Sequence, residues 1–252
     1  MYLFQYILSY VIPDLKYYSF FLFLSFLVYK SYEPMKLILN NNIKFRNYTL
    51  DKQNYIIKNL IKSIVMSIIF IFMIFVFIPN LLKNKWNDSH NRLVGAFYVS
   101  NDLAGLIAVK NLPLSTKVHH YTTVFLYTII CIISTEEKSN IGRLIVVYTI
   151  FSCIPFLVNS YLGLRFFYTR EKIKNENDRK INKIIDLNRI LAFYIYIVCC
   201  ILNWSYHIIF LLNIIKLGDF SFTYLVYYGL LYPIINDDII LLTWLKENKL
   251  DL

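Results

Sequence analysis

Two adjacent histidines, His119 and His120, stand at the start of a long uncharged run. No Asp, Glu, Lys or Arg follows them until Glu136. Ionisable groups at membrane depth are costly, and they usually mark a substrate path or a catalytic centre. An imidazole can serve as a general acid or base, as an acyl acceptor or as a metal ligand. We favour a functional role because two successive histidines at a membrane boundary are hard to satisfy by packing alone.

The composition indicates that these histidines lie in an integral membrane protein. The chain has 252 residues, 58% of them apolar, and a mean hydropathy of +0.50. About 20 apolar residues cross the hydrocarbon core of a bilayer, which is ~30 Å thick. Runs of about this length without Asp, Glu, Lys or Arg are Ser63–Leu82, Val118–Thr135, Leu144–Leu164 and Ile190–Ile215.

Three weaker apolar runs bring the predicted number of spans to about seven. They are Tyr17–Tyr29, Leu93–Val109 and Phe220–Asn236, the last of which ends at the pair Asp237 and Asp238. We therefore predict an all-α membrane protein. The four cysteines all fall within apolar runs, which favours packing over a disulfide or zinc site.

The distribution of basic residues predicts the orientation. With a luminal N-terminus, the cytosolic segments hold 18 of the 26 Lys and Arg residues, the opposite side holds 7, and Lys62 lies just inside the second span. Cytosolic loops are enriched in these residues. The cytosolic segments are then Lys30–Asn59, Lys110–Lys117, Arg165–Arg189 and the tail after Asn236.

The net charge of +10 invites a nucleic-acid interpretation, which the charge pattern disfavours. Juxtamembrane Lys and Arg are attracted to anionic cytosolic leaflets, and this accounts for the excess. The segment Arg170–Arg189 also contains four acidic residues, as is typical of a solvated connector. We expect no nucleic-acid partner.

Several other polar side chains within the predicted spans need a partner. In lipid each would be unsatisfied, so we expect them to point inward. One interpretation is that they form hydrogen bonds between helices and hold the bundle together. The other is that they bind substrate. The candidates for substrate binding are Tyr98, Thr123, Tyr127, Asn159, Asn203 and His207.

Metal chemistry is an alternative for the histidines. Asp102 and the two imidazoles could supply three ligands, but the chain has only four histidines and none of the HxxxH or HxxHH clusters of membrane di-iron enzymes. We predict no metal site. The absence of a glycine-rich phosphate loop, a GxSxG motif and a CxxC motif likewise gives no support to nucleotide hydrolysis or redox chemistry.

An ordered set of residues resembles the TLC domain family, which includes the ceramide synthases. The set comprises Tyr98 and Asp102 in one span, a short loop with Leu112-Pro113, His119-His120, and Pro155-Phe156-Leu157-Val158-Asn159. Phe97 stands where the family has glycine, and Phe151 lies where an acidic residue is common. The resemblance covers roughly residues 50–245.

The resemblance implies a six-helix barrel around a lipid-accessible cavity, with one helix outside it. It divides the chain into an N-terminal span and basic loop (1–49), a TLC-like domain (50–245) and a short cytosolic tail (246–252). It further implies that His119 and His120 catalyse acyl transfer from acyl-CoA, with Asp102 orienting one imidazole. Lys110 and Lys117 could meet the phosphates of CoA.

Two functions stay open on these grounds. One is an acyltransferase that joins an acyl group to a lipid amine or hydroxyl, such as a sphingoid base, with acyl-CoA as co-substrate and no tightly bound cofactor. The other is a non-enzymatic protein that binds or traffics lipid or regulates membrane composition. Both imply membrane lipids as partners, and the resemblance favours the endoplasmic reticulum. The sequence does not predict an oligomeric state.

The predicted orientation can be tested at two glycosylation sequons, which begin at Asn47 and Asn87. Only Asn87 is luminal in this topology. Synthesis in the presence of microsomes should therefore give a glycan at Asn87 and none at Asn47, detected as an endoglycosidase-sensitive mass shift in Asn→Gln variants. A glycan at Asn47 would invert the topology.

Overall fold

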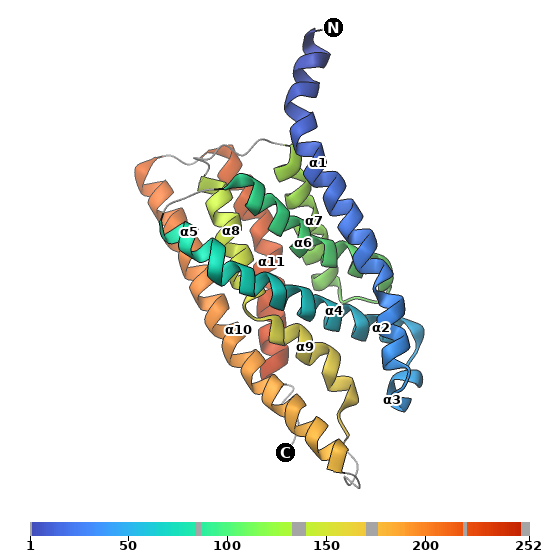
Figure 1. Cartoon of the computed structure of the whole chain (residues 1–252). Coiled ribbons are helices and arrows are strands. Elements are labelled where there is room, and N and C mark those ends of the chain that lie inside the picture. The colour runs from blue at the N-terminus through green and yellow to red at the C-terminus, as the bar shows by residue number, and fades with distance from the viewer. Residues whose placement is uncertain (1, 84–86, 133–139, 170–175, 219–220, 248–252) are drawn as a thin grey trace.

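The computed structural model describes residues 2–83, 87–132, 140–169, 176–218 and 221–247 (Figure 1). No strand occurs in these ranges, which confirms the all-α prediction. The helices are α1 (Tyr2–Lys30), α2 (Tyr32–Leu39), α3 (Ile43–Arg46), α4 (Leu50–Phe72), the π-helix η1 (Met73–Phe77), α5 (Ile78–Leu82), α6 (Asp88–Ala108), α7 (Leu114–Ile132), α8 (Asn140–Cys153), α9 (Phe156–Leu164), the 3₁₀ helix η2 (Arg165–Phe167), α10 (Glu176–Leu217) and α11 (Phe222–Glu247).

Three helical segments of the described chain are long and apolar enough to cross a membrane: Leu50–Asn80, Asp178–Leu217 and Phe222–Glu247. The bent pair of α8 and α9 makes a fourth if it is counted as one span. These segments show a membrane-embedded protein, as predicted. The helices α1, α6 and α7 do not meet the same criterion, so the count of seven spans stays a prediction.

Two predicted spans differ from the observed helices. The run Leu144–Leu164 is interrupted at Ile154 and Pro155, where the segments on either side are bent by 40°. Proline lacks a backbone donor and its ring crowds the preceding turn, so it interrupts the helix there. The run Phe220–Asn236 is too short, because α11 continues without a break to Glu247.

Side-chain caps fix the starts of the two helices that carry the central charged residues. The Thr49 hydroxyl accepts a hydrogen bond from the backbone N–H of Lys52 (3.4 Å), and α4 begins directly after Thr49, at Leu50. Asn87 accepts from the backbone N–H of His90 (3.0 Å) at the start of α6. Such caps satisfy backbone donors that the first helical turn leaves free.

The helices are packed in a continuous series of neighbours. Helix α4 contacts α6, α6 contacts α7, α7 contacts α11, α11 contacts α10, α10 contacts α9, and α9 returns to α4. Helix α1 contacts α6 and α7 from outside this series. Figure 1 shows α1 and α10 on opposite sides of the molecule.

The outer surface of α10 is apolar along most of its length, as lipid contact requires. Large side chains exposed there are Ile184, Leu187, Leu191, Tyr194, Val198, Leu202, Ile209 and Leu212. An exposed apolar surface this extensive is unusual for a soluble protein and typical of one that faces lipid.

Helices α4 and α9 approach closely at Gly163. A Cβ atom there would lie 2.8 Å from the Leu60 side chain and 3.3 Å from the carbonyl oxygen of Ile56. Small residues permit such close packing between membrane helices. By contrast, a Cβ on Gly229 in α11 would meet nothing within 4 Å.

The two glycines therefore make a matched test of this packing. Gly163→Ala should lower stability by about 1–3 kcal/mol through overpacking, measured by thermal unfolding in detergent. Gly229→Ala should leave stability unchanged or raise it by up to about 1 kcal/mol, since alanine favours helix. Equal effects of the two substitutions would contradict the observed packing of α4 against α9.

Candidate functional site

A cavity of about 230 Å³ lies within the series of packed helices. Its lining comes from α4, α6 and α7, from α8 and α9 on either side of the Pro155 break, and from η2, α10 and α11. Both predicted histidines line it. The cavity combines apolar side chains with several charged ones, so it can hold a ligand that carries both polar and apolar groups.

The carboxylate of Asp102 is fully buried beside this cavity and is held by three side chains. Lys62 Nζ lies 2.5 Å from its Oδ1. The Thr123 hydroxyl donates to its Oδ2 over 2.8 Å. Nδ1 of His120 lies 3.0 Å from Oδ1, although the ring is not aligned for a hydrogen bond. A buried carboxylate requires this kind of compensation.

The other nitrogen of His120 is also engaged. Lys58 Nζ lies 3.0 Å from Nε2, and a charged lysine can only donate. That donation places the ring proton of His120 on Nδ1, next to Asp102. Gly105 makes room for the lysine, because a Cβ there would lie 2.9 Å from the Lys58 side chain.

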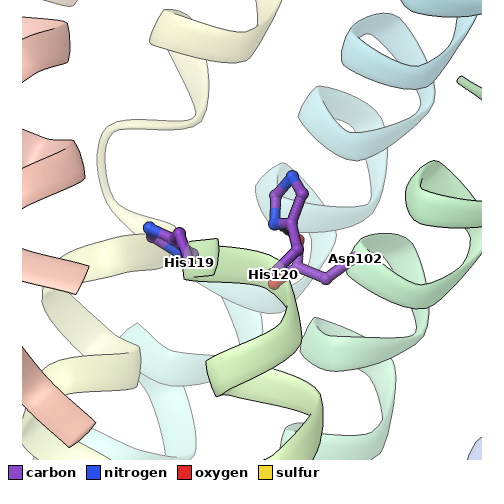
Figure 2. A group of neighbouring side chains, drawn as sticks. All are labelled: Asp102, His119 and His120. Atoms are coloured by element: carbon purple, nitrogen blue, oxygen red, sulfur yellow. Dashed lines mark ion pairs between the residues drawn. The ribbon is translucent and has the colours of Figure 1, made fainter. Parts of the chain in front are cut away.

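His119 is less constrained than His120. Its Nδ1 lies 3.1 Å from Oδ2 of Asp237, again without hydrogen-bond alignment. Its Nε2 is buried and has no hydrogen-bond partner among the described residues. Figure 2 shows that the two imidazoles leave α7 in different directions, with Asp102 beside His120. His119 therefore lines the cavity and keeps one ring nitrogen without a hydrogen-bond partner in the described chain.

The acidic pair of α11 belongs to the site. The sequence had placed Asp237 and Asp238 after the last span, but both are buried within α11 and line the cavity. Thr116 donates to Asp237 (3.3 Å), and Tyr196 of α10 donates to Asp238 (2.7 Å). Helix α11 thereby brings two carboxylates to the side of the cavity that His119 faces.

The structure brings some of the predicted substrate-binding residues to the cavity. Tyr98 and Asn159 line it. Thr123 lies behind it, bonded to Asp102.

The other three predicted residues, Tyr127, Asn203 and His207, do not line the cavity. The Tyr127 hydroxyl donates to the carbonyl oxygen of Arg92 (2.9 Å). His207 Nδ1 lies 2.8 Å from the carbonyl oxygen of Asn203, so it carries the proton, and Nε2 accepts from Tyr227 (3.0 Å). The Tyr127 and Tyr227 contacts join neighbouring helices, as the alternative interpretation expects. The contact between His207 and Asn203 lies within α10, and Oδ1 of Asn203 has no hydrogen-bond partner among the described residues.

One oxygen or nitrogen from each of Asp102, His119 and His120 lies within 4.8 Å of the others, so the three could surround a cation. Two lysines compete with that arrangement. Lys62 pairs with the carboxylate and Lys58 with His120, at 2.5 and 3.0 Å. A metal would have to displace or repel both ammonium groups, which makes this donor set a poor one for a divalent ion.

Sequence analysis missed three cations of the site. Lys58 and Arg165 were assigned to cytosolic connections, and Lys62 was placed at the edge of a span without a role. The spacing of Lys58 and Lys62 offered a signal, because residues four apart share a helix face and a buried Asp102 needs a cation. No comparable pattern marked Arg165.

The pair of Lys62 and Asp102 can be tested through stability. Lys62→Met should destabilise the protein by about 3–5 kcal/mol, because it leaves a buried carboxylate without its cation. Thermal unfolding in detergent measures the loss. Adding Asp102→Asn to the Lys62→Met variant should recover part of the lost stability. Lys183→Met, on the exposed surface of α10, should have little effect. Equal effects of Lys62→Met and Lys183→Met would show that the pair does not stabilise the fold.

Comparison with known proteins does not assign the chain to a family. No family model matches it, and no curated protein or solved structure is significantly similar to it. The function must therefore be argued from the cavity and its side chains.

Proposed function

We propose that the protein is a membrane-embedded acyltransferase that moves an acyl group from acyl-CoA to a lipid amine or hydroxyl. The observation that carries this proposal is the buried Nε2 of His119, which has no hydrogen-bond partner among the described residues and belongs to a side chain that lines the cavity. A neutral imidazole with one free nitrogen can act as a general base or as an acyl acceptor.

In the direct route, Nε2 of His119 removes the proton from the attacking amine or hydroxyl. The new C–N or C–O bond forms at the thioester carbonyl as the C–S bond breaks. The imidazolium then returns its proton to the departing thiolate, which yields free CoA and the acylated lipid. No metal or redox cofactor is needed for this balance.

The two carboxylates have different roles in this proposal. Asp237 lies beside Nδ1 of His119 and holds the ring with its proton on that side, so that Nε2 stays free. Asp102, which the sequence assigned as the orienting acid, serves His120 instead. With both of its ring nitrogens engaged, His120 positions the wall of the cavity and takes no proton from substrate.

We further propose that α4, α6, α7, α8–α9, α10 and α11 form a six-helix barrel, with α1 outside it. The closed series of helix contacts supports this arrangement. The cavity of about 230 Å³ is smaller than most ligand pockets, which start near 300 Å³. It therefore holds only the reacting ends of the two substrates. The acyl chains would extend from it toward the lipid.

The orientation and membrane remain part of the proposal. The N-terminus is placed in the lumen and the C-terminus in the cytosol, so acyl-CoA arrives from the side that bears the basic segments. A resemblance to the TLC domain family supports the endoplasmic reticulum as the membrane and a sphingoid base as one candidate acceptor.

A second function, lipid binding without turnover, is favoured by one specific observation. The buried Asp102 carboxylate is compensated by its own protein neighbours, Lys62, Thr123 and His120. Such a network is typical of a structural role. In that case the cavity holds a lipid that co-purifies with the protein, and acyl-CoA is not consumed.

The two functions are separated by acyl transfer in liposomes. Purified protein should transfer labelled palmitate from palmitoyl-CoA to a long-chain amino alcohol or to diacylglycerol, detected by chromatography of the lipids. His119→Ala should lower the rate by about 10²–10⁴-fold, which is typical for loss of a general base. Asp237→Asn should lower it less, and His90→Ala, at an exposed position, should not change it.

Full activity of the His119→Ala variant would show that the assigned role is wrong. No transfer by the wild type, together with co-purifying lipid, would establish the second function instead.

A further inference from the structure

Arg165 is the least satisfied cation of the cavity wall. It begins η2, directly after α9, and its Nε atom is buried without a hydrogen-bond partner among the described residues. No described carboxylate lies within ion-pair distance of its guanidinium. The side chain lines the cavity and is only half-buried, so it lies where a ligand can reach it.

Aromatic rings hold the guanidinium in place. Its Cζ lies 4.2 Å from the ring centre of Trp244, 4.8 Å from that of Phe166 and 5.9 Å from that of Tyr55. Cation–π contacts of this kind attract the positive charge but leave the N–H groups without acceptors. Arg165 is therefore fixed in position while its donors stay available.

A second cation lies near the same tyrosine ring. Lys58 Nζ lies 6.0 Å from the Tyr55 ring centre and also lines the cavity. Its one close partner in the described chain is His120, which is an imidazole and not a carboxylate. The only tight ion pair of a lysine in the cavity wall, within the described ranges, belongs to Lys62. Two cations without acidic partners thus share one tyrosine.

We infer that Arg165 and Lys58 form a binding site for a phosphate group carried by the ligand of the cavity. The guanidinium presents two parallel N–H donors that match phosphate oxygens, and the ammonium has two donors left after its bond to His120. A phosphate offers three strong acceptor oxygens, whereas a carboxylate offers two, so a phosphate suits a site with two cations better.

This inference extends the proposed function, and it rests on that function for the choice of coenzyme A as one probe. The phosphate has two possible sources: coenzyme A, which is soluble, or the headgroup of a phospholipid. Both present phosphate to the same two cations, and the experiment separates them.

Binding is measured by calorimetry on the full chain in detergent, with coenzyme A in one series and dioctanoyl-phosphatidic acid in the other. The affinity of the wild type for one of these probes should fall at least tenfold in Arg165→Gln. Arg46→Gln, which removes the same charge from the exposed part of α3, should change it less than twofold. Arg165→Lys keeps the charge, loses the paired donors, and should bind more weakly than the wild type.

The site is refuted if neither probe binds, if Arg165→Gln and Arg46→Gln behave alike, or if octanoate binds as tightly as the phosphate compounds. Should Arg165→Gln fail to fold, Arg165→Lys decides: unchanged affinity in that variant refutes the site. The binding experiment contains no acyl donor together with an acceptor, so its result does not depend on acyl transfer. A protein that binds the phosphate compounds but transfers no acyl group would refute the proposed function and leave this inference intact.

Discussion

The Asp102 carboxylate is the group around which this membrane domain must be arranged. It is fully buried, and an uncompensated charge is not tolerated there. Its partners come from two other helices, with Lys62 on α4 and both Thr123 and His120 on α7. Each contact therefore fixes the distance between two helices as well as one charge. The apolar surfaces of these helices drive burial, while the carboxylate specifies which faces meet.

That arrangement gives the two adjacent histidines unequal surroundings. A helix turns by about 100° from one residue to the next, so His119 and His120 face different neighbours. His120 lies between Asp102 and Lys58, each of which comes within 3.0 Å of one of its ring nitrogens. His119 faces α11 and keeps one nitrogen unoccupied. Neighbouring residues of the same type thus differ in their surroundings, since only His119 keeps a ring nitrogen with no close partner in the described chain.

The apolar composition sufficed to predict an all-α membrane protein, and uncharged runs located most of the long helices. The break at Pro155 could also have been expected, since proline interrupts a helix wherever its missing donor is not replaced. The extent of α11 could not have been predicted. An acidic pair indicates the end of a span unless the buried partners of the two carboxylates are known.

The site was predictable only in part for the same reason. Polar residues within apolar runs identified His119, His120 and Asp102, and the structure brings them together. Whether such a residue reaches a cavity or joins two helices depends on its rotation about the helix axis. Tyr98 and His207 are both buried, but only Tyr98 lines the cavity. Cations near span ends are still harder, because Lys58 and Arg165 resemble ordinary topology signals until their surroundings are seen.

The position of the acidic pair on α11 has a consequence for biosynthesis. Lys62, Asp102 and His120 all belong to helices that leave the ribosome early, so their charges can neutralise one another while the rest of the chain is still being inserted. Asp237 emerges later, on α11, and only then does Nδ1 of His119 gain the carboxylate that lies 3.1 Å from it. Helices α4, α6 and α7 can thus pair their charges first, and the surroundings of His119 are completed only when α11 takes its place.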